Sequence, residues 1–190
     1  MTAVNRKLQR PANDLATGSP RIYVACLASY NNGRLHGKWI AADQPLEDMA
    51  SEVRSMLAKS PEPEAEEWAI HDYEGFGSLR LGENERLARI SAIATGISEH
   101  GPAFIAWLSR DSSRDLSKPN AFTDAYRGEW ESLRAYTEAY AESAELCSAA
   151  EKAGSPYIKV NIEELQADLV IETYTVPSDH GTVYVFDANV

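Results

Sequence analysis

Apolar residues near the start of the chain fall into two short runs with a turn signal between them. The first run, Arg21–Ser29, is rich in aliphatic residues, and the second spans Gly37–Ala41. Between them lies Tyr30-Asn31-Asn32-Gly33, and Asn-Gly is typical of a type I′ turn because both residues tolerate a positive φ. The pattern therefore predicts a β-hairpin.

A helical period follows this hairpin. Asp43 offers an N-cap, and Pro45 suits the first turn of a helix. Apolar residues then recur at helical spacing, namely Leu46, Met49, Ala50, Val53 and Leu57. We expect this helix to pack on the sheet and to end before Pro61. The charged stretch 61–67 has no apolar period, and 68–73 is expected to be a third strand.

The middle of the chain is predicted to be mainly helical, from Leu79 to about Asp124. Asn84 can cap a helix whose inner face carries Leu87, Ile90, Ala94 and Ile97. Gly101 ends that helix, and Pro102 begins another, which carries Phe104, Ile105 and Leu108.

The last third of the chain begins with the apolar stripe of one long expected helix. Its members are Trp130, Leu133, Thr137, Tyr140, Ala144 and Cys147. Residues 156–160 are expected to form a strand. Asn161 and Glu164 form a capping-box signature before Leu165 and Leu169. Residues 172–176 and 182–187 alternate in polarity and predict a final hairpin with its turn at 178–181.

These elements predict an α+β fold class, elongated, with three small modules in series. The modules are an N-terminal α+β domain at 21–74, a helical middle domain at 75–124 and a C-terminal α+β domain at 125–190. Residues 1–20 are polar, basic and free of aromatic residues, which is typical of a flexible leader. The chain has no internal repeat.

The charge is unevenly distributed along the chain. From Trp39 onward there are 28 Asp/Glu against 12 Lys/Arg, whereas residues 1–38 hold six basic residues and the single acid Asp14. The body therefore carries a charge of −16 and repels nucleic acid. All four tryptophans lie within the acidic region, so the charge belongs to folded surfaces rather than to a disordered tail. The basic leader is interpreted as a solvated tail, with contact to nucleic acid as the alternative.

The cysteines and the hydropathy of the chain indicate the cellular compartment of the protein. Cys26 and Cys147 lie far apart without CxxC spacing, so neither a disulfide framework nor a zinc site is indicated. No stretch approaches the roughly 18 apolar residues of a membrane span, and residues 1–20 lack the apolar core of a signal peptide. We expect no membrane association and a cytoplasmic location.

The residues that could carry chemistry do not form a convincing active site. His71 neighbours Asp72 and Glu74, but successive strand residues point to opposite faces, so His71 and Asp72 are not expected to face one site. Gly75-Phe76-Gly77-Ser78 lacks the remaining elements of a phosphate loop and is interpreted as a turn. Cys147 lies on the apolar stripe, which favours a core role. We predict no catalytic, cofactor-binding or metal-binding residues, and no cofactor.

Four acids on the expected long helix form a ridge of charge. Glu131, Glu138, Glu142 and Glu145 fall within one stripe at about 100° per residue. A solvated helix face is the plain interpretation. The ridge carries one charge per ~5 to 7 Å, whereas a DNA strand carries one per ~3.4 Å. Acids from other segments would have to join the ridge for the surface to resemble a duplex.

Several segments together resemble the ArdA-type antirestriction proteins. The residues that carry the resemblance are 21–39 (RIYVACLASYNNGRLHGKW), 67–76 (EWAIHDYEGF), 126–132 (YRGEWES) and 182–186 (TVYVF). The match is spread from about Pro20 to Phe186, and the leader lies outside it.

This resemblance implies a DNA mimic rather than an enzyme. Proteins of this family are elongated, usually homodimeric, and imitate bent B-form DNA. They occupy the DNA groove of type I restriction-modification enzymes, formed by the methyltransferase and specificity subunits, and so protect incoming mobile DNA; direct binding of nucleic acid is not expected. The function rests on a distributed surface, so the partner-binding acids are predicted from their positions in this chain. They are Asp72, Glu74, Glu83, Glu85, Glu129, Glu131, Glu138, Glu142, Glu145, Glu163, Glu164, Asp168 and Glu172.

Two other functions stay open at this point. An acidic adaptor would bind a basic protein without imitating DNA, and duplex DNA would not displace it from its partner. A small hydrolase or metal-dependent enzyme would use His71, Asp72 and Glu74, although the metal-ligand spacing is missing.

Overall fold

The protein combines helices with two small antiparallel sheets. A computed structural model describes residues 18–154 and 159–190. The chain divides into two compact units between Glu99 and His100, and each unit holds one three-stranded sheet of the described residues. The mixed class of helices and antiparallel sheets is therefore confirmed. The elongated series of three modules, with its boundaries, stays a prediction.

The sheet of the first unit has the strand order β2-β1-β3. Strand β1 (Arg21–Cys26) pairs antiparallel with β2 (Gly37–Ala41) on one side and with β3 (Trp68–Glu74) on the other. Ile22 of β1 lies opposite Ile40 of β2 and is fully buried. The predicted pairing of the first two strands and the predicted third strand are confirmed.

The connection between β1 and β2 differs from the predicted type I′ turn. The first strand ends at Cys26, and the next residues form a short helix, α1 (Leu27–Asn31). Gly33 has a φ of 74°, but Asn32 has a φ of −89°, whereas a type I′ turn needs a positive φ at both positions. The N–H of Cys26 still donates to the carbonyl of His36 at 2.8 Å, so the ladder continues beyond the strand. The loop is therefore a helical turn between paired strands.

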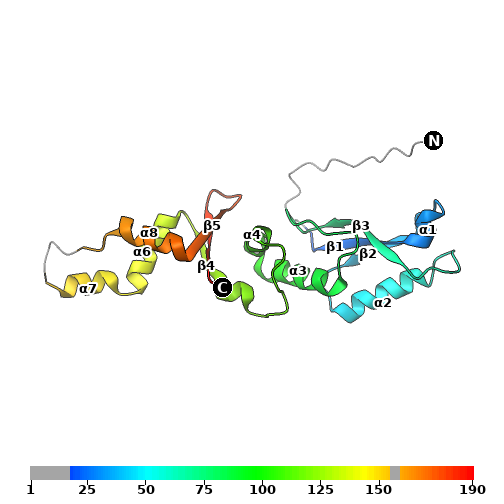
Figure 1. The fold of residues 1–190 in the computed structure, drawn as a ribbon, viewed down its shortest axis with the longest axis horizontal. Helices are drawn as coiled ribbons and strands as arrows, with labels where there is room; N and C mark the ends of the chain where they lie inside the picture. Colours follow the sequence, from blue (N-terminus) through cyan, green and yellow to red (C-terminus); the bar gives the residue numbers. More distant parts are fainter. Residues whose placement is uncertain (1–17, 155–158) are drawn as a thin grey trace. The chain divides into compact units, whose positions relative to one another are not determined.

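Helix α2 (Leu46–Leu57) covers one side of this sheet (Figure 1). It buries Met49, Val53 and Met56. The residue before the helix is Pro45, so the predicted N-cap Asp43 is wrong. The Asp43 carboxylate instead accepts a hydrogen bond from the hydroxyl of Ser98 at 3.3 Å, two residues upstream of the cap position.

Helix α3 (Leu87–His100) closes the first unit and begins later than predicted. The N–H of Ile90 donates to the carbonyl of Arg86 at 3.0 Å, which places the helix start after Arg86 and excludes Asn84 as its cap. The predicted inner residues Ile90, Ala94 and Ile97 are buried. Ser91 donates to the carbonyl of Gln44 at 2.9 Å and ties α3 to the loop before α2.

The second unit surrounds a sheet of order β4-β6-β5 with helices. Gly101 precedes α4 with a φ of 62°, so the predicted break and the predicted second helix are confirmed. The elements of this unit are α4 (Pro102–Arg110), α5 (Ala121–Ala125), β4 (Tyr126–Trp130), α6 (Leu133–Ser143), α7 (Leu146–Lys152), α8 (Ile162–Glu172), β5 (Thr173–Pro177) and β6 (Val183–Asp187) (Figure 1).

The central strand β6 is covered on both faces. Val185 packs in a cluster with Tyr136 of α6 and Leu169 of α8. Phe186, which points to the opposite face, contacts the rings of Phe122 and Tyr174 with centroids 6.3 and 5.1 Å apart. Burial on both faces explains why this strand holds the unit together.

The single long helix predicted from Trp130 to Cys147 is wrong. Trp130 is the last residue of β4, which pairs with β6, and its indole N–H donates to the carbonyl of Arg127 at 2.9 Å. Ser132 then caps α6 by accepting from the N–H of Ala135. Helix α6 ends at Ser143, and Glu145 has a φ of 56° before α7 begins. A residue in the left-handed region interrupts the helix and redirects the chain.

The predicted Asn161 cap and the predicted final hairpin are confirmed. The side chain of Asn161 accepts from the N–H of Glu164 at 3.3 Å and caps α8, and β5 pairs with β6 as the final hairpin. The strand predicted at 156–160 falls largely outside the described residues, and Lys159 and Val160 are not in a strand.

Candidate functional site

His71, Asp72 and Glu74, the residues considered for catalysis, all lie exposed on β3. The pairing of β1 with β3 shifts register between Tyr23 and Val24, so His71 is the extra residue of a β-bulge. His71 is exposed, and its ring meets that of Tyr30 edge to face at 4.7 Å between centroids. Asp72 and Glu74 are exposed on the same strand. His71 is therefore a surface residue that packs against Tyr30.

The two cysteines differ in their surroundings. Burial raises the pKa of the Cys26 thiol, but hydrogen bonds with Ser29 and Ser60 outweigh burial and lower it overall. The sulfur is nevertheless fully buried and out of reach of a substrate. Cys147 lies in α7 and is half-buried, so it is not the core residue that the apolar stripe predicted. Within residues 18–154 and 159–190, no group of three or more His, Cys, Asp or Glu is arranged to hold a metal ion.

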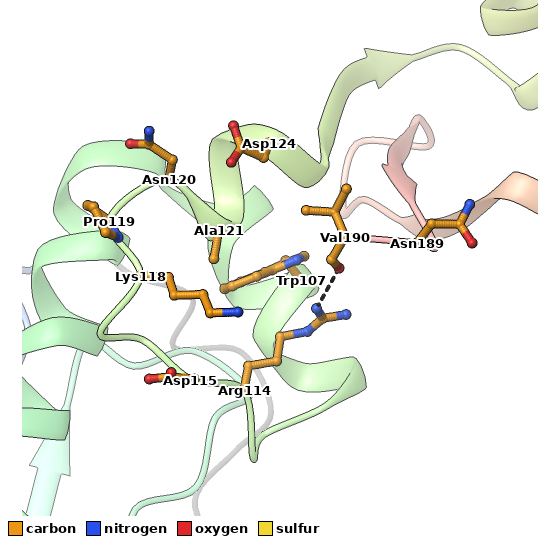
Figure 2. A pocket seen from close by; sticks show the side chains of 10 residues that line it. All are labelled: Trp107, Arg114, Asp115, Lys118, Pro119, Asn120, Ala121, Asp124, Asn189 and Val190. Atoms are coloured by element: carbon orange, nitrogen blue, oxygen red, sulfur yellow. Dashed lines mark hydrogen bonds between the residues drawn. The ribbon is translucent and has the colours of Figure 1, made fainter.

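A hollow of about 480 Å³ lies in the second unit (Figure 2). Arg114 lies over the ring of Trp107 at 4.7 Å and donates to the carbonyl of Val190 at 3.5 Å. The lining residues are Trp107, Arg114, Asp115, Lys118, Pro119, Asn120, Ala121, Asp124, Asn189 and Val190. The side chains that line it include two cations, Arg114 and Lys118, and two carboxylates, Asp115 and Asp124. None of the predicted site residues lies in this hollow.

The predicted partner-binding acids are almost all on the surface. Glu85 is half-buried, and the other twelve are exposed. They belong to both units. The strand positions are Asp72, Glu74 and Glu129; the helix positions are Glu138, Glu142, Glu163, Glu164, Asp168 and Glu172; and the loop positions are Glu83, Glu85, Glu131 and Glu145.

The ridge of four glutamates predicted on one helix is not present in that form. Only Glu138 and Glu142 lie on α6; Glu131 precedes the cap residue Ser132, and Glu145 lies in the break before α7. Residues 126–130 form a strand, and Glu145 has a left-handed backbone conformation. The four glutamates therefore do not lie on one continuous helix, as the predicted ridge requires.

Helix α8 carries an acidic stripe that helical spacing alone could have revealed. Glu164, Asp168 and Glu172 follow one another at intervals of four residues and are exposed. Leu165 and Leu169 form the adjacent packed stripe. Like charges at this spacing cost about 0.2–0.5 kcal/mol per pair. Glu163 and Glu164 lie in the first turn, where the helix dipole stabilises negative charge.

Arg134 joins the acids of α6 and α8. Its Nε donates to Glu138 at 2.9 Å, and its Nη1 donates to Glu163 at 2.9 Å. These hydrogen bonds lower the pKa of the Glu163 carboxyl and raise the pKa of the Arg134 guanidinium. The i,i+4 spacing of Arg134 and Glu138 is visible in the sequence, whereas the contact of Arg134 with Glu163 depends on the packing of α6 against α8.

Some of the other predicted acids accept hydrogen bonds from side chains within the protein, and others form no ion pair. Arg21 donates to Glu74 from Nε and Nη2 at 2.8 and 2.6 Å, and the hydroxyl of Thr182 donates to Glu129. Among the residues that the structure describes, Glu142, Glu164 and Asp168 form no ion pair. Their charge is therefore available to a partner.

The fold and these surfaces define a small mixed α/β protein whose exposed carboxylates are its most prominent chemical feature. The family model described as antirestriction protein (ArdA) matches residues 22–184. The chain therefore belongs to the ArdA antirestriction family, a family of noncatalytic inhibitors that act on restriction-modification enzymes. A comparison with curated proteins finds no match. None of the helices within 18–154 and 159–190 has the length and apolar character needed to cross a membrane.

Proposed function

We propose that this protein inhibits type I restriction-modification enzymes by imitating DNA. Exposed Asp and Glu carboxylates take the place of phosphates and bind the Lys and Arg residues that line the DNA groove of the methyltransferase and specificity subunits. The protein is not an enzyme in this proposal, and it protects incoming mobile DNA in the cytoplasm. Family membership supports the antirestriction role, and the surface charge supports the mechanism.

The observation that carries the proposal is the excess of accessible carboxylates. Twelve of the thirteen predicted acids are exposed, and Glu142, Glu164 and Asp168 form no ion pair among the described residues. These three carboxylates can therefore form charge-assisted bonds to a basic groove.

Competition with DNA tests the proposal. A purified type I methyltransferase is titrated with this protein in the presence of labelled duplex DNA that carries its recognition site. A mimic displaces the duplex, and its own affinity falls as salt is raised because the contacts are charge pairs. Binding to the enzyme without displacement of DNA would favour the acidic adaptor, and affinity that does not change with salt would contradict the electrostatic mechanism.

We also propose that the protein is a homodimer, as the family resemblance implies. Sedimentation equilibrium over a range of protein concentrations tests this, with twice the chain mass of 20.9 kDa as the expected result. A monomer at all concentrations would contradict it.

A further inference from the structure

The ion pairs of Arg134 connect acids from two separate helices. Glu138 lies one turn along α6 from Arg134, and Glu163 lies in the first turn of α8, 29 residues after Arg134 in the chain. Each carboxylate receives one bond of 2.9 Å from a different nitrogen of the same guanidinium. All three side chains are at least half exposed, with fractions of 54%, 50% and 73% for Arg134, Glu138 and Glu163. The group is therefore at the surface and open to a partner.

We infer that Arg134 is a positioning residue of the partner-binding surface, which holds the carboxylates of Glu138 and Glu163 at a set spacing. This inference rests on the proposed function. A guanidinium is a rigid planar fork with five donors, so it can bind two carboxylates in a defined arrangement. Each carboxylate has further lone pairs that stay free for an incoming Lys or Arg.

The packing beneath the three side chains supports a positioning role. Leu133 and Tyr136 of α6 pack with Leu165 and Leu169 of α8, so the two helices already have a fixed separation. Arg134 is therefore not needed to join the helices. What it adds is a fixed arrangement of two long, flexible and mutually repelling side chains, which would otherwise have to be ordered when the partner binds.

A simpler role for Arg134 makes the opposite prediction. If the arginine only neutralises part of the negative surface, its removal makes the protein more acidic and strengthens binding to a basic groove. If it positions the two acids, its removal weakens binding although the net charge becomes more negative.

The test compares Arg134→Met, Arg134→Lys and Arg54→Met with the wild type. Arg54 pairs with Glu47 within α2 at 3.0 Å, so Arg54→Met removes the same charge from an ion pair that joins no second element. Affinity for a purified type I methyltransferase is measured by displacement of duplex DNA at several salt concentrations. Thermal unfolding of each variant controls for folding.

We expect Arg134→Met to bind about fivefold more weakly than the wild type, with a shallower dependence on salt. Arg134→Lys keeps the charge without the fork and should recover part of the loss. Arg54→Met should bind as well as the wild type or slightly better. Equal or tighter binding by Arg134→Met, with a steeper salt dependence, would overturn the inference.

A second measurement does not depend on the partner. The carboxyl of Glu163 is titrated by NMR in the wild type and in Arg134→Met, and its pKa should rise in the variant because the bond from Arg134 lowers it. An unchanged pKa would show that the bridge is absent and would overturn the inference. Failure of the wild type to displace DNA would instead refute the proposed function, and with it the use of the bridge in binding.

Discussion

Gly101 shows how one residue separates two helices. It has a φ of 62° and a ψ of −145°, a combination that is essentially restricted to glycine. A Cβ added at this position would meet no other atom within 4 Å, so the restriction comes from the backbone alone. Pro102 follows and begins α4. The pair therefore sets a sharp boundary after α3.

Substitution of Gly101 by alanine should lower the free energy of unfolding by about 1–3 kcal/mol because alanine is strained in this conformation. Gly82→Ala is the matched control, since Gly82 has neither a positive φ nor a neighbour within 4 Å of the added Cβ. Its effect should stay within about 0.5 kcal/mol. Urea unfolding measures both, and equal effects of the two substitutions would contradict the backbone explanation.

Asp187 at the end of β6 is held by two donors. The N–H of Asn189 donates to it at 2.8 Å, and Arg127 of β4 donates to its other oxygen at 2.8 Å. These bonds lower the pKa of its carboxyl below the ordinary value of 3.8. Because the folded state favours the ionised form, the resulting stability is fully present above pH 3.8 and is lost as pH falls through the lowered pKa.

Asp187→Asn should therefore lower the free energy of unfolding by about 1 kcal/mol at neutral pH. The difference from the wild type should shrink as the pH falls from 3.8 through the lowered pKa, below which the carboxyl is protonated in both the folded and the unfolded state. Thermal unfolding at several pH values measures this. Asp179→Asn, in the exposed turn between β5 and β6, serves as the control, and a difference for Asp187→Asn that persists unchanged at low pH would contradict the assignment.

At the scale of elements, the break between α6 and α7 depends on local backbone conformation. Glu145 has a left-handed φ of 56° without being glycine or asparagine, and α6 ends two residues before it. A left-handed residue with a side chain costs roughly 1–2 kcal/mol. The break is consequently a position where a smaller residue should be tolerated.

Glu145→Gly should be neutral or stabilise the protein by up to about 1 kcal/mol, because relief of the backbone strain offsets the entropy of glycine in the unfolded chain. Glu142→Gly removes the same charge from within α6 and should destabilise by about 0.5–1 kcal/mol. The midpoint of thermal unfolding should thus stay the same or rise in Glu145→Gly and fall in Glu142→Gly. If Glu145→Gly were as destabilising as Glu142→Gly, α6 and α7 would have to be one continuous helix.

At the scale of the whole molecule, the surface charge is shared by many acids. The exposed carboxylates that form no ion pair among the described residues include Glu142, Glu164 and Asp168. Each exposed charge pair contributes about 0.2–1 kcal/mol. Binding energy on such a surface is therefore expected to depend on several acids together.

We expect Glu142→Gln, Glu164→Gln and Asp168→Asn each to weaken binding to the methyltransferase by less than about fivefold, and together by roughly tenfold or more. The control combines Glu47→Gln, Asp48→Asn and Glu151→Gln, which remove the same charge from exposed helix positions outside the predicted set. The control triple should stay close to wild type. An equal loss in both triples would indicate a response to net charge alone, and a severe loss from one single substitution would indicate a hot spot.

Local patterns in the chain determined most of the elements. The helical period from Leu46 to Leu57, the Gly101-Pro102 boundary and the Asn161 cap all act within a few residues, so their physical causes can be read along the chain. The excess of acids is likewise a property of composition, and the family resemblance covers the matched residues 22–184. These features predicted the mixed fold class and the antirestriction role.

Only the tertiary structure decided which distant segments pair and which of their side chains meet. Strand β4 (Tyr126–Trp130) pairs with β6, more than fifty residues later, and its five alternating residues are too short a run to outweigh the helical spacing that begins at Trp130. Because of that pairing and the left-handed Glu145, the four glutamates of the predicted ridge do not share one helix. The packing of α6 against α8 instead brings Arg134, Glu138 and Glu163 together. The sequence by itself determined how much negative charge the protein carries and on which segments, because charge and local period are properties of neighbouring residues. Which acids face one another, and which are held by an arginine, depends on contacts between residues far apart in the chain.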